Sequence, residues 1–74
     1  MRYIGVDLHT TQLTVCYRDE TGSMQIDMFK IDLVDKFVAS LNADDQVAYE
    51  ATGNSLFLYK KLLPVIGEEN ITMP

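Results

Sequence analysis

Three consecutive segments of this chain alternate apolar and polar residues with the two-residue period of a β-strand. They are residues 2–8, 12–18 and 24–31. Residues 19–23 (Asp-Glu-Thr-Gly-Ser) separate the second from the third and have the composition of a turn. The sequence therefore predicts three strands first, of which the second and third form an antiparallel hairpin.

The rest of the chain alternates between helical and strand patterns. Apolar residues recur at helical spacing from Leu33 to Leu41, and Asp32 is expected to cap this helix. A short strand is predicted over 46–51, followed by a second helix that ends near Gly67, with Pro64 kinking or ending its last turn. Residues 71–73 resemble the start of a fifth strand. The order β-β-β-α-β-α-β predicts an α/β fold with one mixed sheet, in which the hairpin lies beside a parallel segment.

The length of 74 residues allows only one small core, because a chain of this size buries about 60% of the surface that it exposes when unfolded. We expect the chain to be the front part of a longer protein, since the pattern stops soon after the fifth strand begins; the alternative is a complete small protein that ends there. The single cysteine, Cys16, excludes an internal disulfide and a cysteine cluster for zinc. Cys16 is expected in the core, and so are Met24 and Met28, which share one strand face.

The formal net charge of −5 opposes a general electrostatic attachment to nucleic acid, because Lys and Arg make the contacts to phosphate. A DNA contact would therefore need metal ions or another domain. No apolar stretch reaches the roughly 20 residues of a membrane span, and no signal peptide is recognisable. These features predict a cytoplasmic protein without a membrane partner. Solvated positions are expected for the loop acids Asp44, Asp45, Glu68 and Glu69. A solvated helix face is also expected for Lys60 and Lys61, with a contact to DNA phosphate as the alternative.

Two acids stand near the ends of otherwise apolar strands, Asp7 in the first and Glu50 in the fourth. If these strands are parallel neighbours, both carboxylates converge at the carboxyl edge of the sheet, in a partly buried site. Close carboxylates repel each other unless a divalent cation bridges them, and oxygen ligands favour Mg²⁺ or Mn²⁺ over zinc. The competing interpretation is that Asp7 caps a turn and Glu50 points to solvent.

Several neutral or titratable residues near these acids are candidates for phosphate contacts. His9 would lie beside Asp7 if the strand continued, either as a loop residue with a hydrogen bond or with a role at the metal or phosphate. Thr10 adds a neutral donor. The segment Thr52-Gly53-Asn54 precedes the second helix, where backbone amides either receive a phosphate or form an ordinary capped turn.

Two motifs give the chain a resemblance to a known family: residues 3–9 (Tyr-Ile-Gly-Val-Asp-Leu-His) and residues 49–55 (Tyr-Glu-Ala-Thr-Gly-Asn-Ser). At this separation they resemble the N-terminal domain of bacterial insertion-sequence transposases of the Asp-Glu-Asp-Asp type, the relatives of pilin-gene invertase. The catalytic domain of that family is similar to the RuvC resolvase and has a ribonuclease H-like fold. The resemblance extends over essentially the whole chain.

The resemblance implies that Asp7 and Glu50 are the first two catalytic acids, and that two further Asp residues lie beyond Pro74. It also implies DNA strand cleavage and exchange with Mg²⁺ or Mn²⁺, a nucleophilic serine in another domain, a guide RNA, and a homo-oligomer of the complete protein. The family often has Lys where this chain has Thr10, so a basic contact is in doubt there. With half of the acids, the chain alone is expected to be inactive on DNA.

Two other interpretations compete with the transposase. Actin-like sugar kinases and ATPases also begin with a strand that ends in Asp, but His9 stands where their close-approach glycine is expected, and its β-carbon would obstruct a phosphate. The other interpretation is a non-catalytic transposase remnant that acts as an interaction domain. An exposed sheet edge would then favour pairing between chains.

Overall fold

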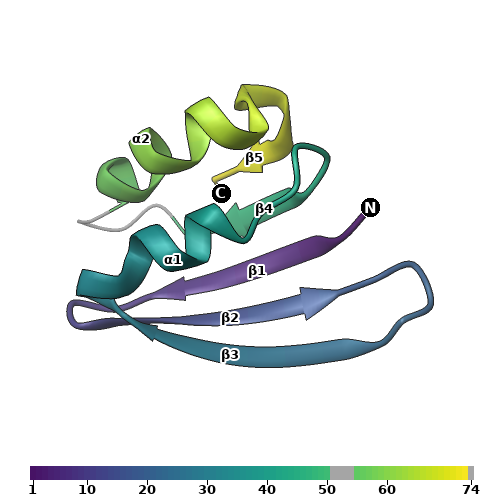
Figure 1. The fold of residues 1–74 in the computed structure, drawn as a ribbon, viewed down its shortest axis with the longest axis horizontal. Coiled ribbons are helices and arrows are strands. Elements are labelled where there is room, and N and C mark those ends of the chain that lie inside the picture. The colour runs from purple at the N-terminus through teal and green to yellow at the C-terminus, as the bar shows by residue number, and fades with distance from the viewer. Residues whose placement is uncertain (51–54, 74) are drawn as a thin grey trace.

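The computed structural model describes residues 1–50 and 55–73, which form one mixed sheet of five strands with two helices on one of its faces (Figure 1). The elements are β1 (Tyr3–Leu8), β2 (Gln12–Arg18), β3 (Met24–Lys30), α1 (Val34–Ala39), β4 (Gln46–Tyr49), α2 (Ser55–Ile66) and β5 (Ile71–Thr72). The predicted α/β fold and its order β-β-β-α-β-α-β are confirmed, and the topology is consistent with a ribonuclease H-like fold. Within the described residues, no helix is long and apolar enough to cross a membrane.

The strand order across the sheet is β3-β2-β1-β4-β5. The pairs β1–β2 and β2–β3 are antiparallel, whereas β1–β4 and β4–β5 are parallel. Parallel neighbours need crossover connections, and α1 and α2 lie in the segments that lead into β4 and β5. The hairpin therefore lies beside the parallel part of the sheet, as the sequence predicts.

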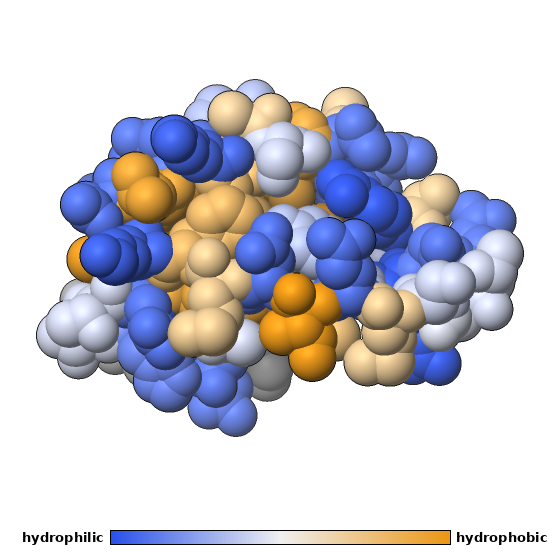
Figure 2. Space-filling view, turned by 60° about the horizontal axis from the view of Figure 1, so that its bottom comes forward, coloured by the Kyte–Doolittle hydropathy of each residue, from blue (hydrophilic) through white to orange (hydrophobic). Residues whose placement is uncertain are grey.

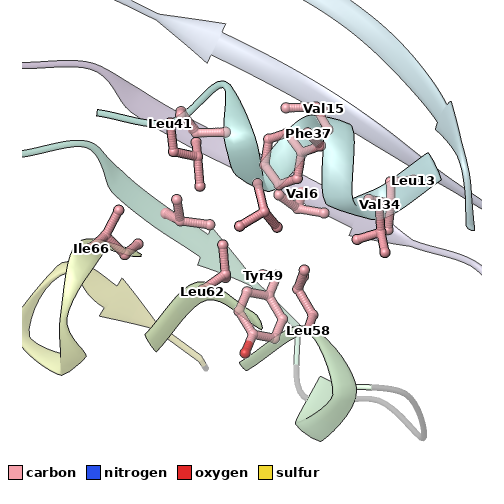
Figure 3. Close-up of a cluster of buried hydrophobic side chains, with 13 residues drawn as sticks. Val6, Leu13, Val15, Val34, Phe37, Leu41, Tyr49, Leu58, Leu62 and Ile66 are labelled. Carbon is pink, nitrogen blue, oxygen red and sulfur yellow. The ribbon is translucent and has the colours of Figure 1, made fainter. Parts of the chain in front are cut away.

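The core fills the space between the sheet and the two helices (Figure 3). Alternate strand residues face it because of the two-residue period, and helix residues three and four apart do so from the other side. Phe37 of α1 is fully buried and lies beside Phe29 of β3, with 5.6 Å between the ring centroids. The buried set is Ile4, Val6, Leu13, Val15, Val34, Phe37, Val38, Leu41, Val47, Tyr49, Leu58, Leu62 and Ile66.

The helix ends differ from the prediction in two details. A 3₁₀ turn over Ile31–Leu33 precedes α1, and Leu33, not Asp32, is the N-cap residue, with no side-chain capping bond. The backbone N–H of Ile31 donates to the carbonyl of Thr11 at 2.9 Å, so pairing with the start of β2 holds the chain up to this residue before it turns. α2 continues past Pro64 to Ile66, so Pro64 does not itself end the helix, whereas the predicted end near Gly67 is confirmed.

Asp45 is buried, which corrects the prediction that it is solvated. Its side chain is only 1% exposed, and it accepts two hydrogen bonds from the Arg2 guanidinium, at 3.0 Å from Nε and 2.6 Å from Nη2. The backbone N–H of Asn42 donates a third bond at 2.7 Å. Arg2 also stacks over the ring of Tyr17, 5.3 Å from its centroid. The ion pair between Arg2 and Asp45 joins the start of β1 to the loop before β4.

The other face of the sheet, which we call the open face, carries no helix in the described part of the chain. Met24 and Met28 do share a face, but it is this one, and both side chains are exposed. Cys16 is only half-buried there. The prediction that these three residues fill the core is therefore wrong. Figure 2 brings the β3 side of the molecule forward and shows apolar side chains exposed among hydrophilic ones.

Candidate functional site

The parallel pairing of β1 with β4 brings Asp7 and Glu50 to neighbouring positions. Val6 of β1 is aligned with Tyr49 of β4. Asp7 is the next residue on β1, and Glu50 directly follows the last residue of β4. Neighbouring strands lie roughly 4.8 Å apart. Since Val6 and Tyr49 face the core, the residue after each faces the opposite side. The prediction that β1 and β4 are parallel neighbours is thus confirmed, and both acids lie on the open face.

The two acids line one open hollow of about 510 Å³ on this face. Its floor includes Cys16, Gly5 and Ala48, which lie side by side on β2, β1 and β4. The acids stand at the end of the hollow where β1 ends. The sheet is depressed here because Gly5 has no side chain and those of Cys16 and Ala48 are small. The sequence analysis missed this floor, although small residues at the middle of three strands were the signal for it.

Asp7 and its neighbours are exposed, which corrects the expectation of a partly buried site. The Asp7 side chain is 72% exposed, and Glu50 is exposed as well. The Nε2 atom of His9 lies 3.1 Å from Oδ2 of Asp7. The backbone N–H of His9 donates to the carbonyl of Gln12 at 2.9 Å, so the tight turn between β1 and β2 holds the imidazole near Asp7. The open face explains the exposure, because nothing in the described chain covers it.

The donors at this site suit a hard cation better than zinc. Asp7 and Glu50 offer carboxylate oxygens, and Mg²⁺ commonly takes one or two protein carboxylates together with waters and substrate phosphates. Across residues 1–50 and 55–73, no group of three or more His, Cys, Asp or Glu side chains is placed to hold a metal ion. The two acids therefore fit Mg²⁺ or Mn²⁺ in kind, and they provide only part of a ligand set.

The remaining candidates for phosphate contacts fall into two groups. Thr10 lies exposed in the turn between β1 and β2, close in sequence to His9. Thr52, Gly53 and Asn54 lie outside the described residues. Of the predicted site residues, Asp7, His9 and Glu50 are the ones that the structure brings to one end of the sheet.

Comparison with known proteins adds no relative to this picture. No protein-family model matches the chain, and no curated protein gives a significant match. The likeness to Asp-Glu-Asp-Asp transposases consequently depends on the two motifs around Asp7 and Glu50 and on their separation.

Proposed function

We propose that this chain supplies the first two catalytic carboxylates of a DNA transposase or recombinase that cleaves and exchanges strands with Mg²⁺ or Mn²⁺. The observation that carries the proposal is the β1–β4 register, which aligns Val6 with Tyr49 at the carboxyl ends of adjacent parallel strands, so that the next residues are Asp7 and Glu50. This is the usual position of ligands in sheets with parallel strands. In this proposal the complete protein acts in the cytoplasm as a homo-oligomer, with DNA and a guide RNA as partners.

Within this proposal the two acids share one task and His9 has another. Asp7 and Glu50 would hold the cation, which when bound supplies positive charge for the reacting phosphate and activates a nucleophile. His9, 3.1 Å from Asp7, would orient that carboxylate. The open hollow leaves room for a DNA backbone to approach both acids. Since the chain carries a net charge of −5, the phosphate could approach only with such a cation between them.

Metal binding by the two acids is the first test. We expect Mn²⁺ to broaden the NMR signals of amides around Asp7, His9 and Glu50 selectively. Asp7→Asn or Glu50→Gln should lower the affinity at least about tenfold, or about 1.4 kcal/mol, because each removes one of two charged ligands. The matched control is Asp35→Asn, since the Asp35 side chain is 78% exposed and lies on α1. Equal broadening at all surface acids would contradict the site.

Activity on DNA is the second test. We expect no Mg²⁺-dependent nicking by the 74-residue chain, because two acids supply only part of the metal ligands. Robust nicking that Asp7→Asn abolishes would show that no further acids are needed. The reading frame past Pro74 tests the same point: the proposal expects two further Asp residues and a serine-bearing domain there. A stop codon at that position would argue against catalysis and for an interaction domain.

A further inference from the structure

The open face of the sheet has four rows of side chains, which the strand register defines; the shortest contains Gln12 and Lys30, at the end of the sheet where Asp7 lies. The middle row crosses all five strands and contains Ile26, Cys16, Gly5, Ala48 and Thr72. One flanking row contains Met24, Arg18, Tyr3 and Gln46, and the other contains Met28, Thr14 and Asp7, with Glu50 directly after β4. The face therefore has a small-residue centre and two chemically different ends.

Apolar side chains on this face are exposed to a degree that favours an interface. Met24, Ile26 and Met28 follow one another along β3, and each is more than half exposed. Tyr3 of β1 is similarly exposed. Two hollows of about 510 and 410 Å³ share Gly5, Cys16 and Ala48 as lining residues, so they meet over the middle row. Exposed apolar surface with a continuous depression is typical of a surface that binds another protein.

The charges at the two ends of this face are complementary to each other. Arg18 lines the hollow at one end, whereas Asp7 and Glu50 line the hollow at the other end. A two-fold axis along the middle row would turn a second copy so that its acidic end lies over the Arg18 end of the first. Such an interface is isologous, and it would bring Ile26 over Ile26, Cys16 over Cys16 and Met24 over Met28.

Pairing through the sheet edges is less favourable than pairing through this face. β5 is only two residues long, so it offers few backbone groups. Along β3, the backbone N–H of Met28 already donates to the carboxylate of Asp27 at 3.1 Å. A charge at an edge strand opposes the addition of another strand. The exposed edge expected to favour pairing between chains is thus partly blocked on the β3 side.

We propose that the open face binds a second copy of this chain, sheet against sheet and antiparallel, with Cys16 near the two-fold axis. A stable interface buries about 800 Å² on each partner. The accessible surface of the described chain is 4703 Å², so one sheet face of this small domain reaches that size only if nearly all of it is covered. The dimer is therefore expected to have a Kd in the micromolar range.

This inference goes beyond the chemistry of the proposed function and assigns a surface of this chain to the homo-oligomer that it includes. In the dimer, Arg18 of each copy lies over Thr14 of the other copy, one strand from that copy's Asp7, so a divalent cation and the second copy compete for the Asp7 carboxylate. By reciprocal linkage, Mg²⁺ should weaken the dimer. The dimer itself needs no DNA chemistry, so loss of one proposal leaves the other standing.

Sedimentation equilibrium on the 74-residue chain across micromolar concentrations tests the proposal. We expect a monomer–dimer equilibrium that Ile26→Lys weakens at least tenfold, because Ile26 lies over Ile26 of the second copy and the variant would bring two like charges together there. Ile26 is 66% exposed, so the monomer should stay folded, as circular dichroism will check. The matched control is Leu56→Lys on α2, which is 59% exposed and lies on the helix side. A monomer at every concentration, or a dimer that Leu56→Lys disrupts and Ile26→Lys does not, overturns the proposal.

Orientation is tested by charge exchange and by cross-linking. Arg18→Glu should weaken the dimer, and the double variant Arg18→Glu with Asp7→Arg should restore part of the affinity, because the exchanged charges again face each other. A short bismaleimide should join two chains through Cys16, and Cys16→Ser should abolish this product. A dimer that gives no product through Cys16 overturns the antiparallel arrangement. A dimer that Arg18→Glu leaves unchanged overturns the charge pairing.

Discussion

Phe37→Ala should remove most of the free energy of unfolding of this chain at 25 °C. Removing a fully buried phenylalanine costs about 3–5 kcal/mol, through lost transfer free energy and the cavity left behind. The whole free energy of unfolding expected for a domain of this size is on the order of 5 kcal/mol. Phe37 contacts the core between α1 and the sheet and lies beside Phe29, so its loss removes packing from both layers. Urea denaturation followed by far-UV circular dichroism measures the effect.

The control for this variant is the same substitution at the surface. Phe57 lies on α2 with its ring partly exposed, 5.3 Å from Nζ of Lys61. Phe57→Ala should cost about 1 kcal/mol or less, because it leaves no buried cavity and loses only a partly exposed cation–π contact. Equal losses in the two variants would contradict the view that the cluster around Phe37 holds the fold together.

Arg2→Ala should be the second most damaging change, with a loss of about 2–4 kcal/mol at pH 7. It leaves the Asp45 carboxylate, 1% exposed, without the guanidinium that neutralises it. Breaking a buried ion pair by removing one partner costs more than the pair contributes, because a buried charge remains unpaired. We expect less than the largest such losses, since Arg2 itself is 32% exposed. Urea denaturation at pH 7 measures the loss.

The exposed pair between Lys61 and Asp35 provides the matched control. Its Nζ–Oδ1 distance of 2.7 Å is that of a good hydrogen bond, yet the Asp35 side chain is 78% exposed. Lys61→Ala should therefore cost about 0.5 kcal/mol, as is usual for solvated pairs. If the Arg2 and Lys61 variants lost the same free energy of unfolding, burial of Asp45 would not be the cause.

The loss in Arg2→Ala should depend on pH. Burial by itself raises the pKa of Asp45, but hydrogen bonds from Arg2 and from the Asn42 N–H outweigh burial and hold the pKa below its ordinary value. A carboxylate with a lowered folded-state pKa stabilises the fold above its unfolded pKa of about 3.9, and this contribution disappears as the pH falls through the folded-state pKa. The difference between wild type and Arg2→Ala should therefore shrink below pH 4. A difference that stays constant would assign the loss to the packing of Arg2 on Tyr17.

Asp45 shows why local patterns miss some buried residues. It stands in a polar loop segment, 42–45 (Asn-Ala-Asp-Asp), whose composition predicts solvent exposure. Its partner Arg2 lies 43 residues earlier in the chain. Only the parallel pairing of β1 with β4 brings the start of the first strand against this loop. The burial of Asp45 is thus a property of long-range pairing, which the local composition does not carry.

At the candidate site, local patterns predicted the residues but not their environment. The strand pattern of 2–8 and 46–51 placed Asp7 and Glu50 near strand ends, and the parallel neighbourhood followed from the helical segment between them. Their exposure depends on what covers the second face of the sheet, and no local pattern reports that. The floor of Gly5, Cys16 and Ala48 likewise required the register of three strands.

By itself, the sequence determined the elements and the sets of side chains that share a face. Both follow from local geometry, because a strand alternates every two residues and a helix returns every three or four. Tertiary structure alone decided which strand face is covered. The crossovers put both helices on the side of Val6 and Val15, so Phe37, Leu58 and Leu62 pack there, while Met24, Ile26 and Met28 remain exposed on the other side. The physical reason is that burial depends on contacts between segments distant in sequence, and the same alternation satisfies either side of a sheet.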